Sequence, residues 1–415
     1  MHRYAYVLIS TLAVALTACS GGDDGTGASA PPDAKPAATE SGKPAYPTDA
    51  TAKASTRAGA DSWPADWATK ELPSRKIPNI PETAEAYYAP DSLHVIAQTQ
   101  DPKALRAKDA KSAGGALTWI FKDDGSESWP VNDHGQDACS WFFPDMKHII
   151  WTSTRDHMDL PVGNWSDDSD YPRGAELYIS DWKGGNIKRL TNNNDYEAEV
   201  TVSPDGKWIV FGRNINGNMD IWRMKSDGTE EKQLTFTPDW QEGAPYFLPD
   251  SKTIIYRAWQ HSVTEEIKRV REATGKRSQT PMTIFTMNLD GSDVQPRTFT
   301  DDMNWAPFPA PDGRHFVYVR VSEGNNWDVY MSDLAGGEAK RLTWNPSFDG
   351  FPSISPDGKK MLFTRSTGEH FMSDLYTYVM DISSLNVGPE NYKGVPPKSE
   401  APPGWKLPVE KTATN

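Results

Sequence analysis

Short stretches in which apolar and polar residues alternate recur through most of the chain, separated by turn-forming residues. One full cycle is clear in the β-rich and turn segments 307–310, 311–314, 315–320, 327–332 and 339–343. Alternation with a period of two is typical of strands that bury one face. In the turn of sequence Pro-Asp-Gly-Arg, the proline fixes one φ angle, and the glycine can adopt φ angles that other residues avoid. The pattern predicts four antiparallel strands in each cycle.

A Pro-Asp pair marks the first turn of every cycle and measures the repeat. The pair occurs six times, with the aspartates at Asp91, Asp145, Asp205, Asp250, Asp312 and Asp357. Successive aspartates are 54, 60, 45, 62 and 45 residues apart, so the longer intervals look like the 45-residue unit plus an insertion. Repeats of about 40–50 residues built from short strands are typical of propeller blades. We therefore expect an all-β fold, a six-bladed β-propeller of four-stranded antiparallel blades.

The ends of the repeat array predict how the ring closes. The sixth cycle leaves the pattern after Ile382, before a fourth strand, and a strand-like segment at 74–78 precedes the first cycle. We expect this N-terminal strand to complete the last blade, because an unpaired sheet edge invites aggregation.

The insertions predict where binding loops gather. All three join the second strand of a blade to the third, at about 98–115, 155–174 and 260–281. They therefore lie on the face that also carries the inter-blade connections, which we call the top face. Within the last insertion, Val263, Ile267 and Val270 form a helical stripe that either packs on the blades or offers a docking edge.

The chain termini differ from the repeats in composition. A basic start at His2 and Arg3 and a short apolar run precede Leu16-Thr17-Ala18-Cys19, which resembles the lipobox of bacterial lipoproteins. The resemblance implies a signal peptide at 1–19, lipidation of Cys19 and a lipid anchor in the membrane. Ser20 after the cysteine is similar to an outer-membrane address, which predicts an outer-membrane lipoprotein of the cell envelope, facing either the periplasm or the surface.

Domain boundaries follow from the same composition. Residues 20–70 consist mostly of small and polar residues and read as a disordered tether. We expect the propeller to span 71–386 and a Pro-rich C-terminal tail to span 387–415. The second cysteine, Cys139, has no partner once Cys19 is lipidated, so it reads as a small buried apolar residue. The net charge of −14 argues against a nucleic-acid partner.

The repeat sequence resembles a known family. Two copies read Ser-Pro-Asp-Gly-Lys, at 203–207 and 355–359, and later motifs in the cycle read Asp-Gly and Leu-Thr. This pattern resembles the PD40 (WD40-like) repeat of TolB-type propellers over roughly 74–386. The resemblance is specific for the fold, and many unrelated activities use such a propeller.

Counting back from the Pro-Asp pairs identifies a candidate binding site. Seven residues before each proline stand Thr83, Asp137, Glu197, Glu242, Asn304 and Asp349, which we expect at the top mouth of the central channel. Two residues further on stand Glu85, Cys139, Glu199, Ala244, Ala306 and Phe351. Carboxylates held together raise each other's pKa unless something neutralises them. A hard cation such as Ca²⁺, a Lys or Arg of a partner, or water and salt could each do so.

Aromatic and acidic residues near the mouth add two further candidates. Tyr196, Trp240, Trp305, Phe348 and Phe351 belong to the same rim and could stack on a sugar or grip a peptide side chain, although most of the 16 Trp residues should pack between blades. A second cluster, Asp167, Asp168 and Asp170 in the blade-two insertion, reads either as a Ca²⁺ loop or as a solvated loop.

The sequence favours binding over catalysis. It contains no Gly-x-Ser-x-Gly elbow, no His-Glu-x-x-His pair and no phosphate-binding loop. The leading hypothesis is a non-enzymatic binding or scaffold module for an envelope protein, peptide or glycan on the top face. The alternatives are a metal-binding propeller and a carbohydrate-active lyase or hydrolase that uses Asp137, Glu197 or Glu242 as acid and base.

Overall fold

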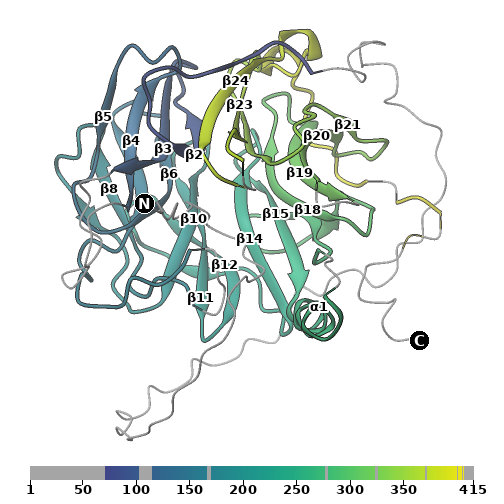
Figure 1. The fold of residues 1–415 in the computed structure, drawn as a ribbon, viewed down its shortest axis with the longest axis horizontal. Coiled ribbons are helices and arrows are strands. Elements are labelled where there is room, and N and C mark those ends of the chain that lie inside the picture. The colour runs from purple at the N-terminus through teal and green to yellow at the C-terminus, as the bar shows by residue number, and fades with distance from the viewer. Residues whose placement is uncertain are drawn as a thin grey trace, which may run out of the picture.

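The computed structural model describes residues 71–101, 115–165, 170–275, 279–322, 326–369, 372–399, 401–403 and 405. These residues form six sheets of four antiparallel strands, arranged around a common centre (Figure 1). The predicted all-β six-bladed propeller is confirmed.

The first three blades follow the chain from the inside of the ring outward. Blade one contains β2 (Thr83–Tyr88), β3 (His94–Asp101), β4 (Gly115–Lys122) and β5 (Ser128–Pro130). Blade two contains β6 (Asp137–Phe142), β7 (His148–Ser153), β8 (Glu176–Asp181) and β9 (Lys188–Arg189). Blade three contains β10 (Tyr196–Val202), β11 (Trp208–Ile215), β12 (Asn218–Lys225) and β13 (Lys232–Gln233).

The other three blades repeat this order until the last strand. Blade four contains β14 (Trp240–Phe247), β15 (Thr253–Gln260), β16 (Thr283–Asn288) and β17 (Gln295–Pro296). Blade five contains β18 (Met303–Pro309), β19 (His315–Ser322), β20 (Asn326–Asp333) and β21 (Lys340–Arg341). Blade six contains β22 (Asp349–Ile354), β23 (Lys360–Ser366), β24 (Leu375–Asp381) and β1 (Ser74–Lys76).

The two ends of the ring meet at blade six. β1 pairs antiparallel with β24, with Ser74 opposite Met380 and Lys76 opposite Tyr378. The inner strands β2 and β22 contact one another, so blade one packs against blade six. The N-terminal segment thus occupies the place that the fourth strand fills in the other blades.

The Pro-Asp pairs cap the turn between the first and second strands. In all six turns the aspartate Oδ1 accepts the backbone N–H two residues further on, at 2.8–3.2 Å. The residue after the aspartate has a left-handed φ of 55–72° in every case, which is why three of the six are glycine. In three turns the carboxylate also lies 2.5–2.6 Å from the Nδ1 of a histidine, namely His94, His148 and His315.

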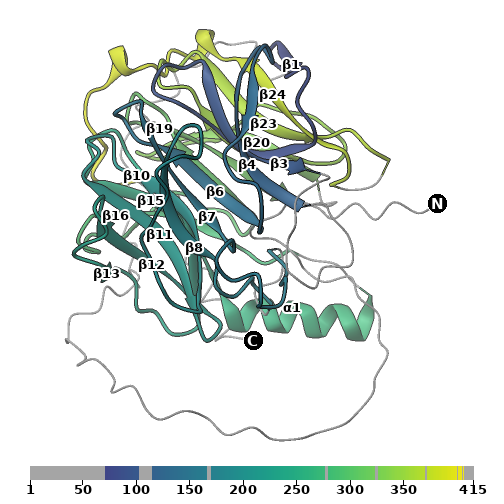
Figure 2. The same cartoon turned by 90° about the vertical axis from the view of Figure 1, so that its left-hand side faces the viewer.

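Helix α1 (His261–Thr274) confirms the helix expected in the blade-four insertion. Figures 1 and 2 show it at one edge of the molecule, opposite the 3₁₀ helices η3 (Ser383–Leu385) and η4 (Pro389–Asn391). Thr264 is its one buried residue, and Val270 is 39 % exposed, so the apolar stripe is not sealed against the blades. Among the residues that the structure describes, no helix is long and apolar enough to cross a membrane.

The segment after blade six packs against the propeller instead of leaving it. A Cβ on Gly358 would lie 2.4 Å from the Cα of Gly388, and one on Gly313 would lie 2.5 Å from the ring of Tyr392. These two turn glycines therefore make room for the segment where it crosses blades six and five.

The same segment then reaches blade four. Arg297, which is 3 % exposed, donates to the carbonyl of Leu334 at 2.6 Å and to that of Pro396 at 3.0 Å. Trp405 packs edge-on against Phe299, with ring centres 5.0 Å apart. We call the described residues between 387 and 405 the C-terminal strap.

Deleting residues 388–415 should destabilise the protein. The deletion removes the strap carbonyls that accept from Nη2 of Arg297, and a hydrogen bond to a charged group contributes about 1.5–3 kcal/mol. We expect a lower Tm in thermal unfolding and a free energy of unfolding reduced by at least that amount. Deleting only 406–415, which lie outside the described residues, is the matched control. Equal Tm values for the two deletions would contradict the role given to the strap.

Candidate functional site

The six predicted mouth residues do occupy equivalent positions in the six blades. Each lies at or near the beginning of an innermost strand, in β2, β6, β10, β14, β18 and β22. All of them are buried, with 0–1 % exposure: Thr83, Asp137, Glu197, Glu242, Asn304 and Asp349. The expected open ring of acidic groups is therefore absent at these positions, because the side chains lie between packed strands.

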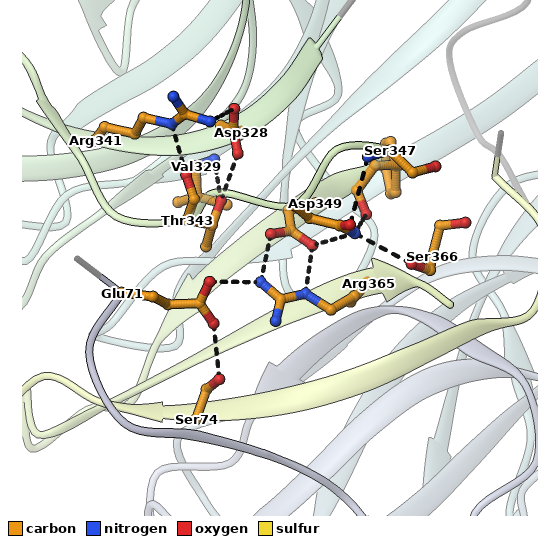
Figure 3. Close-up of polar contacts among 12 residues, drawn as sticks. Glu71, Ser74, Asp328, Val329, Arg341, Thr343, Ser347, Asp349, Arg365 and Ser366 are labelled. Carbon is orange, nitrogen blue, oxygen red and sulfur yellow. Dashed lines mark hydrogen bonds and ion pairs between the residues drawn. The ribbon is translucent and has the colours of Figure 1, made fainter. Parts of the chain in front are cut away.

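Arginines of the second strand hold two of these carboxylates. In blade six, Arg365 donates Nε and Nη2 to the two oxygens of Asp349 at 2.8 and 2.7 Å, and Nη2 also reaches Glu71 at 2.8 Å (Figure 3). In blade three, Arg213 donates Nε to Glu197 at 2.7 Å and pairs with Glu231 at 2.8 Å. In each of these two blades the arginine therefore lies between an inner and an outer carboxylate. We call this arrangement of three charged groups a row.

Glu71 and Glu231 hold corresponding places in their rows. Glu231 directly precedes β13, the outer strand of blade three, and Glu71 stands three residues before β1, the outer strand of blade six. The N-terminal segment thus supplies both the last strand of blade six and the last charge of its row. Ring closure and the charge state of Asp349 are therefore linked through Arg365.

The recurring Leu-Thr motif has a structural explanation as well. In blade five, Thr343 accepts the backbone N–H of Val329 at 2.9 Å and lies 3.3 Å from a carboxylate oxygen of Asp328, which Arg341 also binds (Figure 3). Thr191 and Thr235 of the other Leu-Thr copies accept the equivalent strand N–H at 2.9 Å, and Thr298, which follows Arg297 in blade four, does the same. The motif ties the fourth strand of a blade to its third.

Burial dominates the titration of these carboxylates. Desolvation raises the pKa of Asp137 to about 6 and that of Glu197 to about 7. It likewise raises the pKa of Asp220 to about 6 and that of Asp328 to about 7, and it raises the pKa of Asp349. Arginines oppose the shifts of Glu197, Asp328 and Asp349 without cancelling them, and uncharged hydrogen-bond partners do the same for Asp137 and Asp220. This layer of the propeller therefore gains protons as the pH falls below neutral.

The second ring of predicted residues forms the channel wall. The inner strand of each blade shifts register near this position. Five of the six residues have a φ of 49–57°, namely Glu85, Glu199, Ala244, Ala306 and Phe351, while Cys139 sits within the shift of β6. A bulge of this kind re-aims side chains. A small cavity is lined by these five residues together with Tyr87, Tyr246, Arg257, Trp305 and Pro352.

The channel wall is an interlocked polar cluster. Arg257 is 1 % exposed and donates to Glu199 at 2.7 Å, and Glu199 also accepts the Ala244 N–H at 2.7 Å. The hydroxyls of Tyr87 and Tyr246 lie 2.5 Å apart. The thiol of Cys139 donates to Glu85 at 3.2 Å. What remains open has room for little more than one water molecule.

Sequence reasoning missed Arg257, although the repeat contains a signal for it. An arginine follows the turn aspartate by eight residues in three blades, at Arg213, Arg320 and Arg365, and by seven in blade four, at Arg257. A shift of one residue in a strand turns the side chain to the other face. Arg257 is accordingly opposite Gly243 and points toward Glu199, whereas Arg213 is opposite Glu197 and Arg365 is opposite Asp349.

The structure buries the predicted rim aromatic residues and describes only part of the predicted metal loop. Tyr196, Trp240, Trp305 and Phe348 are 0–7 % exposed and pack inside the ring, and Tyr196 stacks on Tyr171 at 4.2 Å. Asp170 is exposed, while Asp167, Asp168 and the lipobox Cys19 lie outside the described residues. Within the described ranges, no three His, Cys, Asp or Glu residues are placed to hold a metal ion.

No protein-family model matches the chain. An uncharacterized protein of Agrobacterium fabrum is 28 % identical over 153 residues, which cover 35 % of this chain and 47 % of that protein. The uncharacterized peptidase YuxL of Bacillus subtilis is 36 % identical over 201 residues, covering 47 % of this chain and 26 % of the peptidase. The Tol-Pal system protein TolB of Francisella tularensis is 33 % identical over 85 residues, covering 20 % of this chain and 19 % of TolB. The chain thus spans less than half the length of each of these relatives.

Solved propellers align with most of the chain at low identity. TolB from Acinetobacter baumannii gives a TM-score of 0.47 at 19 % identity, covering 72 % of this chain and 65 % of that one. A putative TolB from Agrobacterium tumefaciens gives 0.48 at 18 % identity, covering 74 % and 96 %. An oligogalacturonate lyase in complex with manganese gives 0.42 at 12 % identity, covering 76 % and 100 %. The assignment as a TolB-like six-bladed β-propeller rests on the repeats and strand order of this chain, and these likenesses carry no argument about activity.

The free energy of unfolding should fall as the pH rises from 5 to 8. A carboxyl group whose pKa is raised on folding binds its proton more tightly in the native state, so its contribution is full at low pH and is lost as the pH rises through the folded pKa. For Asp137 the loss runs from its ordinary pKa of 3.8 up to about 6, and for Glu197 from 4.5 up to about 7, so most of the fall should occur below pH 7. Each buried group can contribute on the order of 1–3 kcal/mol. Urea unfolding at four pH values measures the slope.

Two substitutions identify the source of that slope. Asp137→Asn and Glu197→Gln should flatten it, because the amides do not titrate. Asp227→Asn is the control, since Asp227 is exposed and its hydrogen bonds lower its pKa. A stability that stays constant or rises from pH 5 to 8 would show that these groups do not titrate as described.

Within the blade-six row, removing the central arginine should cost far more stability than neutralising the outer glutamate. Arg365→Met leaves the carboxylate of Asp349 buried without its cation, which costs about 3–5 kcal/mol. Glu71→Gln removes a partly exposed partner and should cost at most about 1 kcal/mol. Urea unfolding of both variants, with Arg213→Met and Glu231→Gln as the matched pair in blade three, measures the difference. The hierarchy is wrong if the glutamine variants lose as much stability as the methionine variants.

Proposed function

We propose that the chain is a non-enzymatic binding module of the bacterial cell envelope, anchored in the outer membrane by lipid on Cys19. It engages an envelope protein, peptide or glycan on its top face. The observation that carries this proposal is the distribution of the loops. Long insertions begin where the second strand ends in blades one, two and four, and these strand ends lie on one face, whereas the opposite face carries short turns and the C-terminal strap. Long loops on a rigid scaffold are where binding residues concentrate.

The envelope location draws support from two sides. The N-terminal sequence resembles a lipoprotein signal peptide, and a TolB protein of the Tol-Pal system shares repeats with this chain. A lipid anchor followed by a polar tether places the propeller near a membrane without burying any of its surface in it.

The alternative of a carbohydrate-active enzyme meets a physical difficulty. Asp137, Glu197 and Glu242 would have to reach a substrate as acid and base, and all three are at most 1 % exposed. The thiol and carboxyl groups of the channel wall are reached through an opening with little more space than one water molecule. Binding on the outer surface of the face needs neither group to be accessible.

Site-specific photo-crosslinking of the full-length protein in cells tests the proposal. A photoreactive amino acid at Asn192 or Pro346 stands on an exposed inter-blade connection of the top face, and one at Lys147 or Asp227 stands on the opposite face. We expect a shared adduct from the two top-face positions and none from the other two. Adducts from the opposite face alone would show that the binding face is misassigned, and no adduct from any position would argue against a partner.

A further inference from the structure

A polar groove lies on the top face beside the channel, between helix α1 and the hairpin that joins β11 to β12. It is open to the solvent. Figure 2 shows α1 running along this face past the ends of β11 and β12. The groove lies outside the channel cluster and shares none of its lining residues. The side chains that matter for its chemistry are Asn216, Asn218, Gln241, His261, Glu265 and Lys268.

Both walls of the groove are fastened to the propeller. Gln241 is 3 % exposed, accepts the Met219 N–H at 2.8 Å and donates to the carbonyl of Gly217 at 3.0 Å. This side chain fixes the hairpin wall to the inner strand of blade four. On the other side, Asp239 accepts the Ser262 N–H at 2.8 Å and so fixes the beginning of α1. Asp239 itself has a φ of 68°, a costly conformation that residues adopt where the surroundings impose it.

One face of the helix supplies the second wall. His261, Glu265 and Lys268 are spaced by four and three residues and so lie along one side of α1. Glu265 and Lys268 form an ion pair at 2.9 Å. His261 Nδ1 is buried and has no hydrogen-bond partner in the part of the chain that the structure describes.

The chemistry of the lining identifies the class of ligand. No apolar side chain lines the groove, so a peptide side chain gains little by entering it. The amides of Asn216 and Asn218, an imidazole and an ion pair instead offer donors and acceptors side by side. A hydroxyl group both donates and accepts a hydrogen bond, so this mixture suits a ligand with many hydroxyls. The charges of Glu265 and Lys268 cancel, so Asp239 gives the lining of the groove a net negative charge. This charge repels an anionic sugar.

We propose that this groove binds a neutral oligosaccharide. The proposal deepens the proposed function, since it names a glycan as one ligand of the top face, and it rests on that function. Its failure remains distinguishable, because the crosslinking experiment above detects protein partners whether or not the groove binds sugar.

Calorimetric titration of the purified protein with maltohexaose, cellohexaose and chitohexaose tests the groove, with hexagalacturonate as the acidic comparison. We expect saturable binding of at least one neutral hexamer and at least tenfold weaker binding of the acidic one. The double variant Asn216→Gly, His261→Ala should weaken binding of the neutral sugar at least tenfold. Asn216 has a φ of 54°, so glycine keeps the backbone while it removes the amide.

A matched control separates the groove from a general effect. Asn186 has a φ of 55° and is exposed in the blade-two hairpin on the opposite face, so Asn186→Gly makes the same chemical change away from the groove. Its affinity should stay within twofold of the wild type, and equal Tm values verify that all variants fold. No saturable binding of any neutral hexamer at millimolar concentration overturns the proposal. So does binding that the double variant leaves unchanged.

Discussion

The guanidinium of Arg365 lies between two carboxylates, that of Asp349 on the innermost strand of blade six and that of Glu71 on the N-terminal segment. Much of the upper layer of the propeller depends on interactions of this kind. A carboxylate at the start of an inner strand is buried between blades, and leaving such a charge unpaired costs several kcal/mol. The second strand supplies the cation, and the outer strand completes its coordination. Radial rows of charge therefore hold inner and outer strands together. In blade six the row also joins the N-terminal segment to the last blade.

These rows are part of the reason why the structure lacks the acidic mouth that the sequence predicts. The predicted carboxylates are buried between strands, and arginines pair with two of them. Sequence spacing located six equivalent positions correctly, because turn chemistry is local and the Pro-Asp pair keeps one register in every blade. Whether a strand residue faces the channel or the neighbouring blade depends on the bulge two residues later, which the sequence does not reveal. Glu85 adopts a left-handed φ at such a bulge without a glycine to announce it. The position of a side chain along the strand was therefore predictable, and its direction was not.

Arg257 shows how small a sequence difference changes a site. One residue fewer between turn and arginine takes it out of the row that Arg213 and Arg365 occupy and places it in the channel, where it pairs with Glu199. The cation then links the second strand of blade four to the inner strand of blade three. Together with the hydroxyl pair of Tyr87 and Tyr246, this linkage nearly fills the channel. A filled channel gives the blades a rigid core, and the proposed function uses that core as the support for the loops and the groove.

The C-terminal strap solves a related electrostatic problem in a different way. Burial lowers the pKa of Arg297 to about 10, which still leaves the guanidinium charged at neutral pH. Within the part of the chain that the structure describes, carboxylates act on it only at longer range, from Asp293 and Asp333. Carbonyl oxygens of Leu334 and Pro396 solvate it instead, together with the hydroxyl of Thr286. A buried cation that depends on main-chain oxygens requires those oxygens to stay in place, so the strap becomes part of the fold. Because the strap crosses the turn face, contacts with a ligand on the opposite face need not disturb it.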